Sequence, residues 1–172
     1  MTGVRALIVT ALVLLPFAAR AQDQDAVTLS PGSFASAIAL DPTTYAPAVS
    51  FYASARLDWD SSQPLLRNGF VETNPRFTIS GRPLDTAIGF EAGKRRILGD
   101  ALVVLEMSAL NNLIERVAAD ALSQRYPEHR KMIRRLGLIE RIAAASLASY
   151  QLSTPLLRQW QANKDLVRQF GY

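Results

Sequence analysis

Residues 67–77 of the chain read RNGFVETNPRF, and this stretch separates two long segments with helical periodicity. Gly69 can adopt the left-handed backbone conformation that commonly ends a helix, and Pro75 keeps the residue before it out of the helical region. A second glycine and a second proline follow a few residues later. We therefore expect an irregular connector over 67–83, which is long for a small helical domain.

The segments on both sides of this connector are predicted to be helices. Apolar residues recur every three or four positions over about 45–66 and over 84–125. Glycines at the start of the second segment predict a kink or a break near Gly93–Gly99. The apolar stripes expected to face a core include Val49, Tyr52, Ala53 and Leu57 in the first segment and Val103, Met107, Leu110, Ile114 and Val117 in the second.

Two further helices are expected after a tight corner at 125–131. Pro127 is placed to begin a third helix, and Ser153-Thr154-Pro155 is expected to end it and to begin a last helix over about 155–169. The predicted buried stripe of the third helix is Met132, Leu136, Ile139, Ala143 and Leu147. Because no stretch alternates with a period of two, the sequence predicts an all-α bundle of about four helices.

The N-terminus has the form of an export signal. Arg5 precedes a short apolar core, and Ala19-Arg20-Ala21 has the small-x-small pattern of a cleavage site. We expect 1–21 to be a signal peptide cleaved after Ala21, with an uncleaved anchor as the alternative. Residues 22–33 are then a mobile segment, and 34–172 form a single helical domain. An exported chain without cysteine fits a periplasmic location or association with the inner membrane.

Composition narrows the possible partners and cofactors. The formal charge of +4 falls to +2 without Arg5 and Arg20, so we expect no nucleic-acid partner. The chain has one histidine, His129, and lacks both a Gly-x-Ser-x-Gly motif and a glycine-rich phosphate loop. We therefore expect no cofactor and no metal bound by histidine or cysteine.

Several acids lie in apolar surroundings and are the first candidates for chemistry. Asp100, Glu106 and Glu140 each have apolar residues at helical spacing around them. A buried charge is costly unless it is paired, so these acids are expected to pair with arginines such as Arg141. The functional alternative is a carboxylate cluster that binds a metal or acts as an acid–base pair.

A short motif carries a resemblance to a group of small, uncharacterised bacterial membrane or exported proteins. It combines an acid and a glutamine near the end of one helix with a glycine and a Glu-x-Asn-Pro run. The matching residues are Asp60, Gln63, Gly69, Glu72, Asn74 and Pro75. The resemblance brings a motif and implies no activity. The candidate binding residues of the chain are Asp60, Gln63, Glu72, Asn74, Glu106 and Glu140. This chain departs from the group because its later helices carry several acids and many arginines.

Two structural interpretations of the motif remain open. In the first, Glu72 and Asn74 bond to backbone groups at the ends of neighbouring helices and pin the connector. In the second, these two residues join Asp58 and Asp60 in an oxygen-ligand site for Ca²⁺ or Mg²⁺.

Two functions follow from these features. The first is a non-enzymatic helical protein that binds a protein partner, a membrane surface or further copies of itself. Small residues near 144–149 would allow the close helix approach that such assemblies use. The second is a metal-dependent hydrolase that uses clustered carboxylates, with Asp60, Glu72, Glu106 and Glu140 meeting in space. The apolar runs 97–110 and 136–152 are shorter than the roughly 20 residues of a membrane span, and both hold acids.

Overall fold

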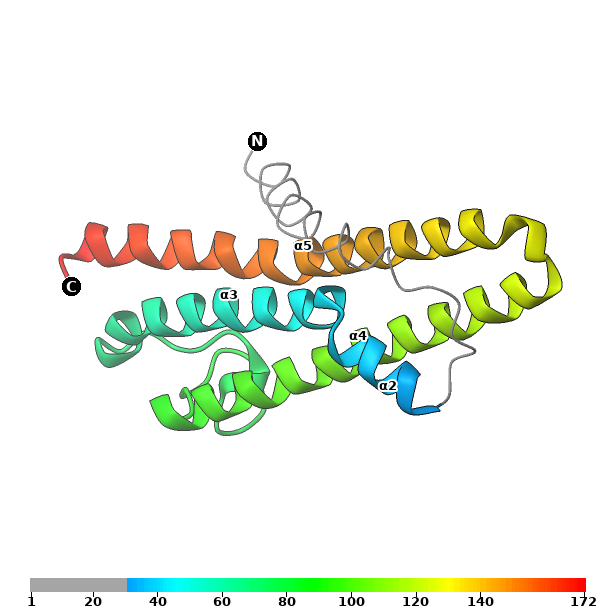
Figure 1. The fold of residues 1–172 in the computed structure, drawn as a ribbon. Coiled ribbons are helices and arrows are strands. Elements are labelled where there is room, and N and C mark those ends of the chain that lie inside the picture. Colours follow the sequence, from blue (N-terminus) through cyan, green and yellow to red (C-terminus); the bar gives the residue numbers. More distant parts are fainter. Residues whose placement is uncertain (1–30) are drawn as a thin grey trace. The chain divides into compact units, whose positions relative to one another are not determined.

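The computed structural model describes residues 31–172 (Figure 1). These residues form a small all-α bundle with no strand, which confirms the predicted fold class. The four α-helices of the described part are α2 (Pro31–Ala39), α3 (Pro42–Arg67), α4 (Phe90–Arg125) and α5 (Arg130–Phe170). The short 3₁₀ turns are η2 (Pro75–Phe77) and η3 (Pro127–His129). The expected signal peptide, 1–21, and most of the segment 22–33 lie outside the described residues.

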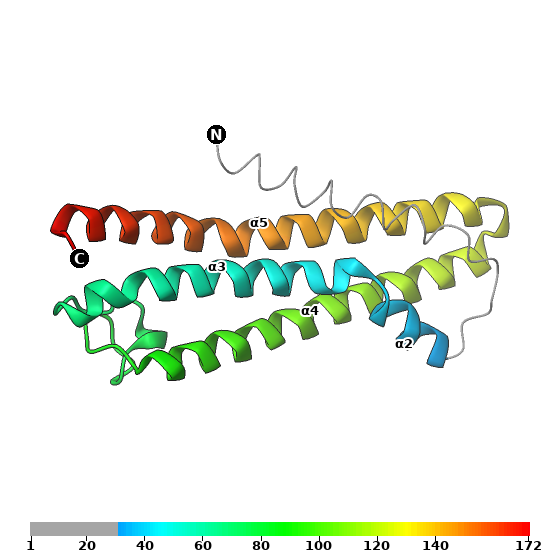
Figure 2. The same ribbon diagram turned by 60° about the vertical axis from the view of Figure 1, so that its left-hand side comes forward.

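The chain forms two compact units, which are described one at a time. Among the described residues, unit 1 comprises 31–49 and Val103–Gln151, and unit 2 comprises Ser50–Leu102 and Leu152–Tyr172. Within unit 1, the later part of α4 and the first part of α5 run side by side and are joined through η3 (Figures 1 and 2).

Helix α3 begins three residues earlier than predicted because Asp41 caps it. The Asp41 Oδ1 accepts a hydrogen bond of 3.0 Å from the backbone N–H of Thr43, and Pro42 occupies the first helical position. At the other end, Gly69 has a φ of +89° two residues after the helix stops at Arg67. The predicted glycine stop is confirmed.

A kink or a break was predicted near Gly93–Gly99, and the break is wrong because helix α4 is continuous from Phe90 to Arg125. Gly93 serves close packing instead, because the indole of Trp59 occupies the space that a Cβ atom would fill. The helix also begins at Phe90 rather than at residue 84. Residues before Phe90 belong to the connector, where Leu84 adopts a positive φ of 59° that a helix does not allow.

Helix α5 continues through Pro155, so the predicted break at Ser153-Thr154-Pro155 is also wrong. A proline inside a helix removes one backbone hydrogen bond, at a cost of about 3 kcal/mol. Leu156 packs against the core cluster of unit 2, and this contact helps to keep the helix continuous. The third helix starts at Arg130, because Pro127 begins the turn η3 instead.

The core of unit 2 forms around Trp59. Its indole Nε1 donates a hydrogen bond of 3.1 Å to the carbonyl oxygen of Phe90, and its ring stacks on Phe77 with centroids 5.1 Å apart. Ala55 and Ile97 complete the buried centre. Tyr52 and Leu57, predicted to face a core, are exposed instead.

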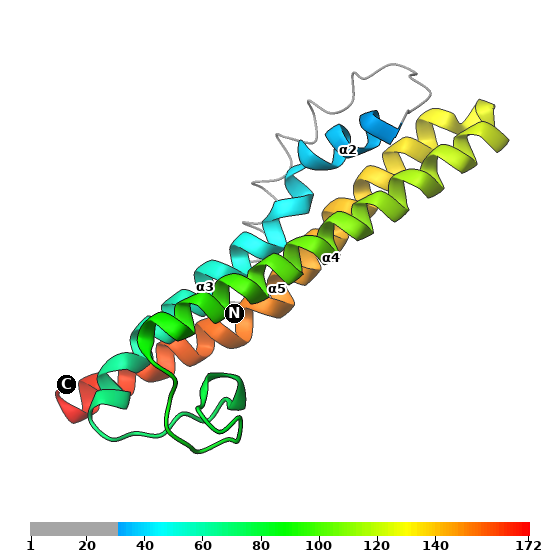
Figure 3. The ribbon, with the colours of Figure 1, turned by 90° about the horizontal axis from the view of Figure 1, so that it is seen from below.

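The connector of unit 2 folds back on itself (Figure 3), and contacts between its own residues hold it. Isolated β-bridges join Glu72 to Asp85 and Thr78 to Ala87. The Thr78 hydroxyl also donates to the carbonyl oxygen of Arg82 at 2.8 Å. The connector therefore extends beyond the predicted residue 83, up to the start of α4.

Candidate functional site

Four charged side chains meet in the interior of unit 1. The Asp41 Oδ2 lies 2.7 Å from Arg116 Nη2 and 3.1 Å from Arg141 Nε. Arg141 also forms an ion pair with Glu115 through its Nη1. Asp41 and Arg141 are buried and Glu115 is nearly so, so each charge is paired where water is scarce. We call Asp41, Glu115, Arg116 and Arg141 the ionic network.

Three elements position the ionic network, and one glycine makes room for it. Asp41 directly precedes α3, Glu115 and Arg116 lie on α4, and Arg141 lies on α5. The Glu115 carboxylate occupies the space where a Cβ atom of Gly137 would stand. Gly137 therefore allows Glu115 to reach Arg141.

Neutral polar groups hold the acid in place. The Asn112 side chain, only 2 % exposed, donates hydrogen bonds of 2.9 Å to Thr43 Oγ1 and 2.8 Å to Thr44 Oγ1. Thr43 Oγ1 in turn donates to Asp41 at 2.7 Å, and Thr44 Oγ1 donates to the carbonyl oxygen of Ile38 at 2.9 Å. These hydrogen bonds thus connect the end of α2 and the start of α3 to Asn112 on α4.

The electrostatics of the network favour the charged form of Asp41. Burial alone would raise the pKa of Asp41, but the hydrogen bonds from Thr43 and the charges of Arg141 and Arg116 outweigh burial and hold that pKa below its ordinary value. Burial and the nearby Arg141 lower the pKa of the Arg116 guanidinium. Because both acids are held by arginines, the arrangement is suited to a fixed polar junction rather than to proton transfer.

The polarity of unit 1 is inverted relative to a water-soluble protein. Its buried residues are mostly polar or charged, and the buried apolar ones are Pro47, Ala48 and Ala145. Large apolar side chains lie on the outside of α4 and α5 instead, each about half exposed or more. We call this set the outer apolar face: Val103, Met107, Leu110, Ile114, Val117, Met132, Leu136, Ile139 and Leu147.

This inversion corrects the predicted core. The stripes over α4 and α5 were expected to be buried, yet they form the outer apolar face. The spacing marks an apolar side on each helix, but spacing alone does not show which side of the helix is covered. The small residues behind the stripe of α5 are the buried ones, since Ala145 is 5 % and Ser149 is 1 % exposed.

Unit 2 holds one acid with an unusual environment. Asn163, on α5, donates hydrogen bonds of 3.0 Å to the Asp58 Oδ1 and 3.2 Å to the Ser61 hydroxyl. Burial, together with the negative charge of Glu72, raises the pKa of Asp58 to about 6. Asp58 is thus half-buried beside a second acid, and no cation is among the groups that shift its pKa.

The predicted site residues of unit 2 have mainly local partners. Asp60 is exposed and pairs with Arg56 at 3.1 Å, one turn earlier. The Gln63 amide donates to the carbonyl oxygen of Trp59 at 2.9 Å, also within α3. These contacts support the helix itself and do not form a shared site.

Glu72 and Asn74 pin the connector, but through different groups than predicted. The Glu72 Oε1 accepts a hydrogen bond of 2.8 Å from the Asn74 N–H, and the Asn74 Oδ1 accepts one of 3.1 Å from the Arg76 N–H. Asn74 therefore caps η2, within the same connector. Their predicted bonds to the ends of neighbouring helices are wrong, because the loop folds back on its own backbone.

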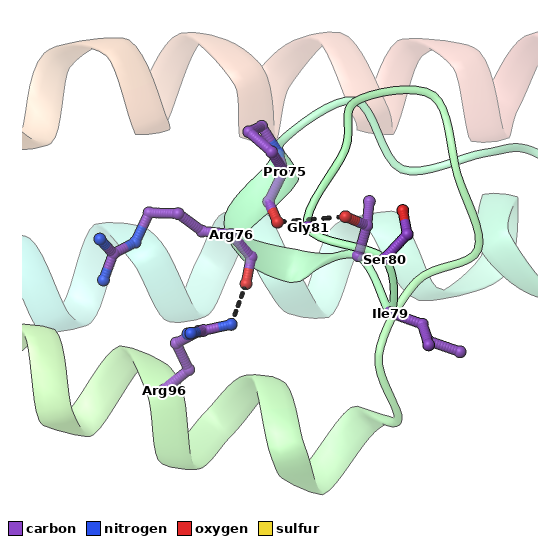
Figure 4. Close-up of a pocket in the computed structure, with 7 residues that line it drawn as sticks. Pro75, Arg76, Ile79, Ser80, Gly81 and Arg96 are labelled. Carbon is purple, nitrogen blue, oxygen red and sulfur yellow. Dashed lines mark hydrogen bonds between the residues drawn. The ribbon is translucent and has the colours of Figure 1, made fainter.

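The connector is held to α4 by arginines (Figure 4). Arg96 Nη1 donates a hydrogen bond of 2.5 Å to the carbonyl oxygen of Arg76, and the Arg76 side chain pairs with Asp100. A depression of about 470 Å³ lies beside them. Both guanidinium groups that border it have partners within unit 2.

Glu106 and Glu140 were predicted to be buried, and both are exposed. They belong to unit 1, whereas Asp60 and Glu72 belong to unit 2. Arg141 pairs with Asp41 and Glu115 rather than with its neighbour Glu140. Glu106 and Glu140 stand at the edge of the outer apolar face, which explains why their apolar neighbours suggested burial.

Within residues 31–172, no three acidic or histidine side chains group closely enough to hold a metal ion. His129 is exposed on η3. Comparisons with protein-family models, curated proteins and solved structures find no match to this chain. Function must therefore be inferred from the residues themselves.

Sequence reasoning missed the ionic network. In the sequence, Asp41 has the local role of a helix cap, and Arg116 has Asp120 at the i,i+4 spacing of an ion pair. Asp120 instead accepts from Gln124 at 2.8 Å. The available signal was the Asp41-Pro-Thr cap, which marks an acid at a fixed position, but its partners lie 75 and 100 residues further along the chain.

Proposed function

We propose that this chain is a non-enzymatic, membrane-associated helical protein in which the outer apolar face of unit 1 lies against the hydrocarbon of a lipid bilayer. The observation that carries this proposal is the inverted polarity of unit 1. In water, nine half-exposed large apolar side chains in one unit are costly, whereas lipid covers them at no such cost. The expected signal peptide suggests that the protein is exported and associates with the inner membrane.

The interior of unit 1 supports this proposal. Away from water, polar groups must find partners within the protein, and charged residues in membrane proteins face the interior and pair with one another. The ionic network has this character, since Asp41 and Glu115 are both bound by Arg141. Small residues such as Ala145 and Ser149 on the buried side of α5 also match the close helix packing found in membranes.

The length of α4 adds a second, weaker support. Among the described residues, α4 alone is long and apolar enough to cross a membrane. Core helices of water-soluble proteins meet the same criterion, but they are mostly buried, whereas the apolar segment of α4 is 17 % buried. The proposal therefore rests on which side chains of α4 face outward.

Carbonate extraction of membranes from cells that express the full chain tests the proposal. The wild-type protein is expected to stay in the membrane pellet, and its release into the wash would contradict the proposal. Met107→Glu with Ile114→Glu places two charges on the outer apolar face and should release the protein, because each charge costs about 3 kcal/mol in hydrocarbon. Gln161→Glu with Gln169→Glu, at exposed positions of unit 2, is the control and should not.

Self-association is the second candidate. Val103, Met107, Leu110, Ile114 and Val117 are spaced by alternating steps of four and three, as in the seam of a coiled coil. Glu106 is exposed beside this seam, where hydrocarbon would penalise its charge but a second copy could pair with it. A water-soluble oligomer seen by analytical ultracentrifugation without detergent would favour this candidate.

The metal-dependent hydrolase stays a prediction. Among the described residues, no group of acidic or histidine side chains that could hold a metal ion supports it. Metal analysis of the purified protein tests it directly. A stoichiometric divalent metal that survives dialysis would revive this function, and its loss on Glu72→Gln would place the site in the connector.

A further inference from the structure

We propose that the corner between α4 and α5, residues 125–135, binds the anionic headgroups of phospholipids and thereby fixes the orientation of unit 1 at the membrane surface. This inference deepens the proposed function and rests on it. The corner joins the ends of the two helix segments that carry the outer apolar face.

Positive charge in unit 1 gathers at this corner. Residues 125–135 contain five arginines and lysines and a single acid, Glu128. The rest of the α4 segment, 103–124, carries three acids and one arginine, and the rest of the α5 segment, 136–151, carries one of each. A bilayer with anionic lipids attracts basic segments next to its apolar region, each cation by a similar amount.

The positions of these cations suit a headgroup layer. Arg125, Lys131 and Arg135 are exposed, and Arg125 lies over the ring of Tyr126 at 5.6 Å from its centroid. Tyrosine is enriched at the boundary between hydrocarbon and water, where its ring and its hydroxyl meet different surroundings. His129 and Glu128 are exposed on η3, with 3.8 Å between His129 Nε2 and Glu128 Oε1.

Apolar neighbours distinguish a membrane from a nucleic acid as the partner. Leu122 on α4 and Met132 on α5 are each about half exposed, directly beside the cations, and Leu136 follows one turn later. A lipid surface offers anionic groups above hydrocarbon and matches both features. The phosphate backbone of a nucleic acid matches only the charges.

Flotation with vesicles of two compositions tests this inference and separates it from the proposed function. The full chain is mixed with vesicles of phosphatidylcholine alone, which report the apolar contribution, and with vesicles that also contain phosphatidylglycerol, which add the charge. The wild-type protein should float with both and should partition more strongly into the anionic vesicles. Each cation near the surface should contribute about fivefold, and added salt should reduce this gain.

The matched variants decide the outcome. Lys131→Gln with Arg135→Gln should lower the anionic gain about 25-fold and leave partition into phosphatidylcholine unchanged. Arg158→Gln with Lys164→Gln removes the same charges from exposed positions of α5 in unit 2 and should keep the gain. If the corner variant keeps the full gain, the inference is overturned while the proposed function stands.

Two further outcomes would also overturn the inference. If the wild-type protein floats with neither vesicle, the proposed function fails and the inference fails with it. If duplex DNA binds the wild-type protein more tightly than anionic vesicles do at the same salt concentration, the corner is a nucleic-acid site.

Discussion

The Nε atom of Arg141 lies 3.1 Å from the carboxylate of Asp41, although a hundred residues separate them in the chain. The same guanidinium group also holds Glu115. One side chain thus connects the start of α3, the middle of α4 and the middle of α5 within unit 1. Because both acids depend on it, Arg141 is the residue whose loss should damage unit 1 most.

Arg141→Ala should therefore lower the free energy of unfolding by about 3–5 kcal/mol, since it leaves Glu115 without its cation in the interior and leaves Asp41 with Arg116 alone. Glu140→Leu, at the neighbouring exposed position, should change it by no more than about 0.5 kcal/mol. Denaturant unfolding of the two variants compares them. Equal losses would show that the network contributes little.

Gly137→Ala should destabilise unit 1 by about 1–3 kcal/mol, because the new methyl group occupies the space of the Glu115 carboxylate and Glu115 is held by Arg141. Gly99→Ala is the matched control on α4. Nothing lies near its added Cβ atom, so it should be neutral or should stabilise the helix by up to about 1 kcal/mol. Thermal unfolding of both variants gives the comparison, and a neutral Gly137→Ala would show that Glu115 moves freely.

The helical class of the fold could be predicted because its signals are local. Gly69 and Pro75 mark the connector, and apolar periodicity marks the helices. The direction in which the helices face could not be predicted in this way. Periodicity shows that one side of a helix is apolar, but burial depends on what covers that side. In unit 1 the opposite side, which carries residues such as Asn112 and Ser149, is the buried one.

The continuity of α4 and α5 also escaped prediction. Gly93 and Pro155 normally weaken or break a helix, and each is tolerated here next to a tertiary contact, with Trp59 and through Leu156 respectively. The partners of Asp41 could not be predicted from the sequence for a related reason. Ion pairs between residues 75 and 100 positions apart leave no spacing pattern in the sequence.

The raised pKa of Asp58 makes the stability of unit 2 depend on pH. Because this pKa is about 6 in the folded chain and its ordinary value is 3.8, the folded state takes up the proton more readily than the unfolded state. The contribution of protonated Asp58 to the free energy of unfolding is fully present below pH 3.8 and is lost as the pH rises through about 6. With solvent screening, it should amount to about 1 kcal/mol.

Asp58→Asn should remove this pH dependence, because the amide does not titrate and its oxygen can still accept from Asn163. The exposed Asp60→Asn is the control and should retain it. The free energy of unfolding, measured at pH 4 and pH 7 for both variants, provides the test. A pH dependence that survives Asp58→Asn would assign it to another group.

The connector should be held by hydrogen bonds and should not require a metal. Asn74→Ala removes the cap of η2 and should cost about 1 kcal/mol, whereas Glu72→Gln keeps an acceptor oxygen for the Asn74 N–H and should be mild. Added Ca²⁺ or Mg²⁺ should leave the melting temperature of the wild-type protein unchanged. A rise with either metal that Glu72→Gln abolishes would show an oxygen-ligand site instead.

The N-terminal leader should be removed on export. The positive start, the short apolar core and the Ala-Arg-Ala sequence predict cleavage after Ala21. Mass spectrometry of the exported protein should find an N-terminus at Gln22. An intact Met1 in the membrane fraction would show an uncleaved anchor.

The central claim is that lipid covers the outer apolar face, and the absence of cysteine from the chain allows a direct test. A single cysteine at Met107 is labelled with a fluorophore, and the full chain is reconstituted in vesicles of brominated phosphatidylcholine. Gln124→Cys, exposed near the α4–α5 corner, serves as the control. The account predicts strong quenching at position 107 by bromine in the acyl chains and weak quenching at position 124. Equal, weak quenching at both positions would contradict it, as would disulfide-linked dimers formed on oxidation of the unlabelled Met107→Cys variant.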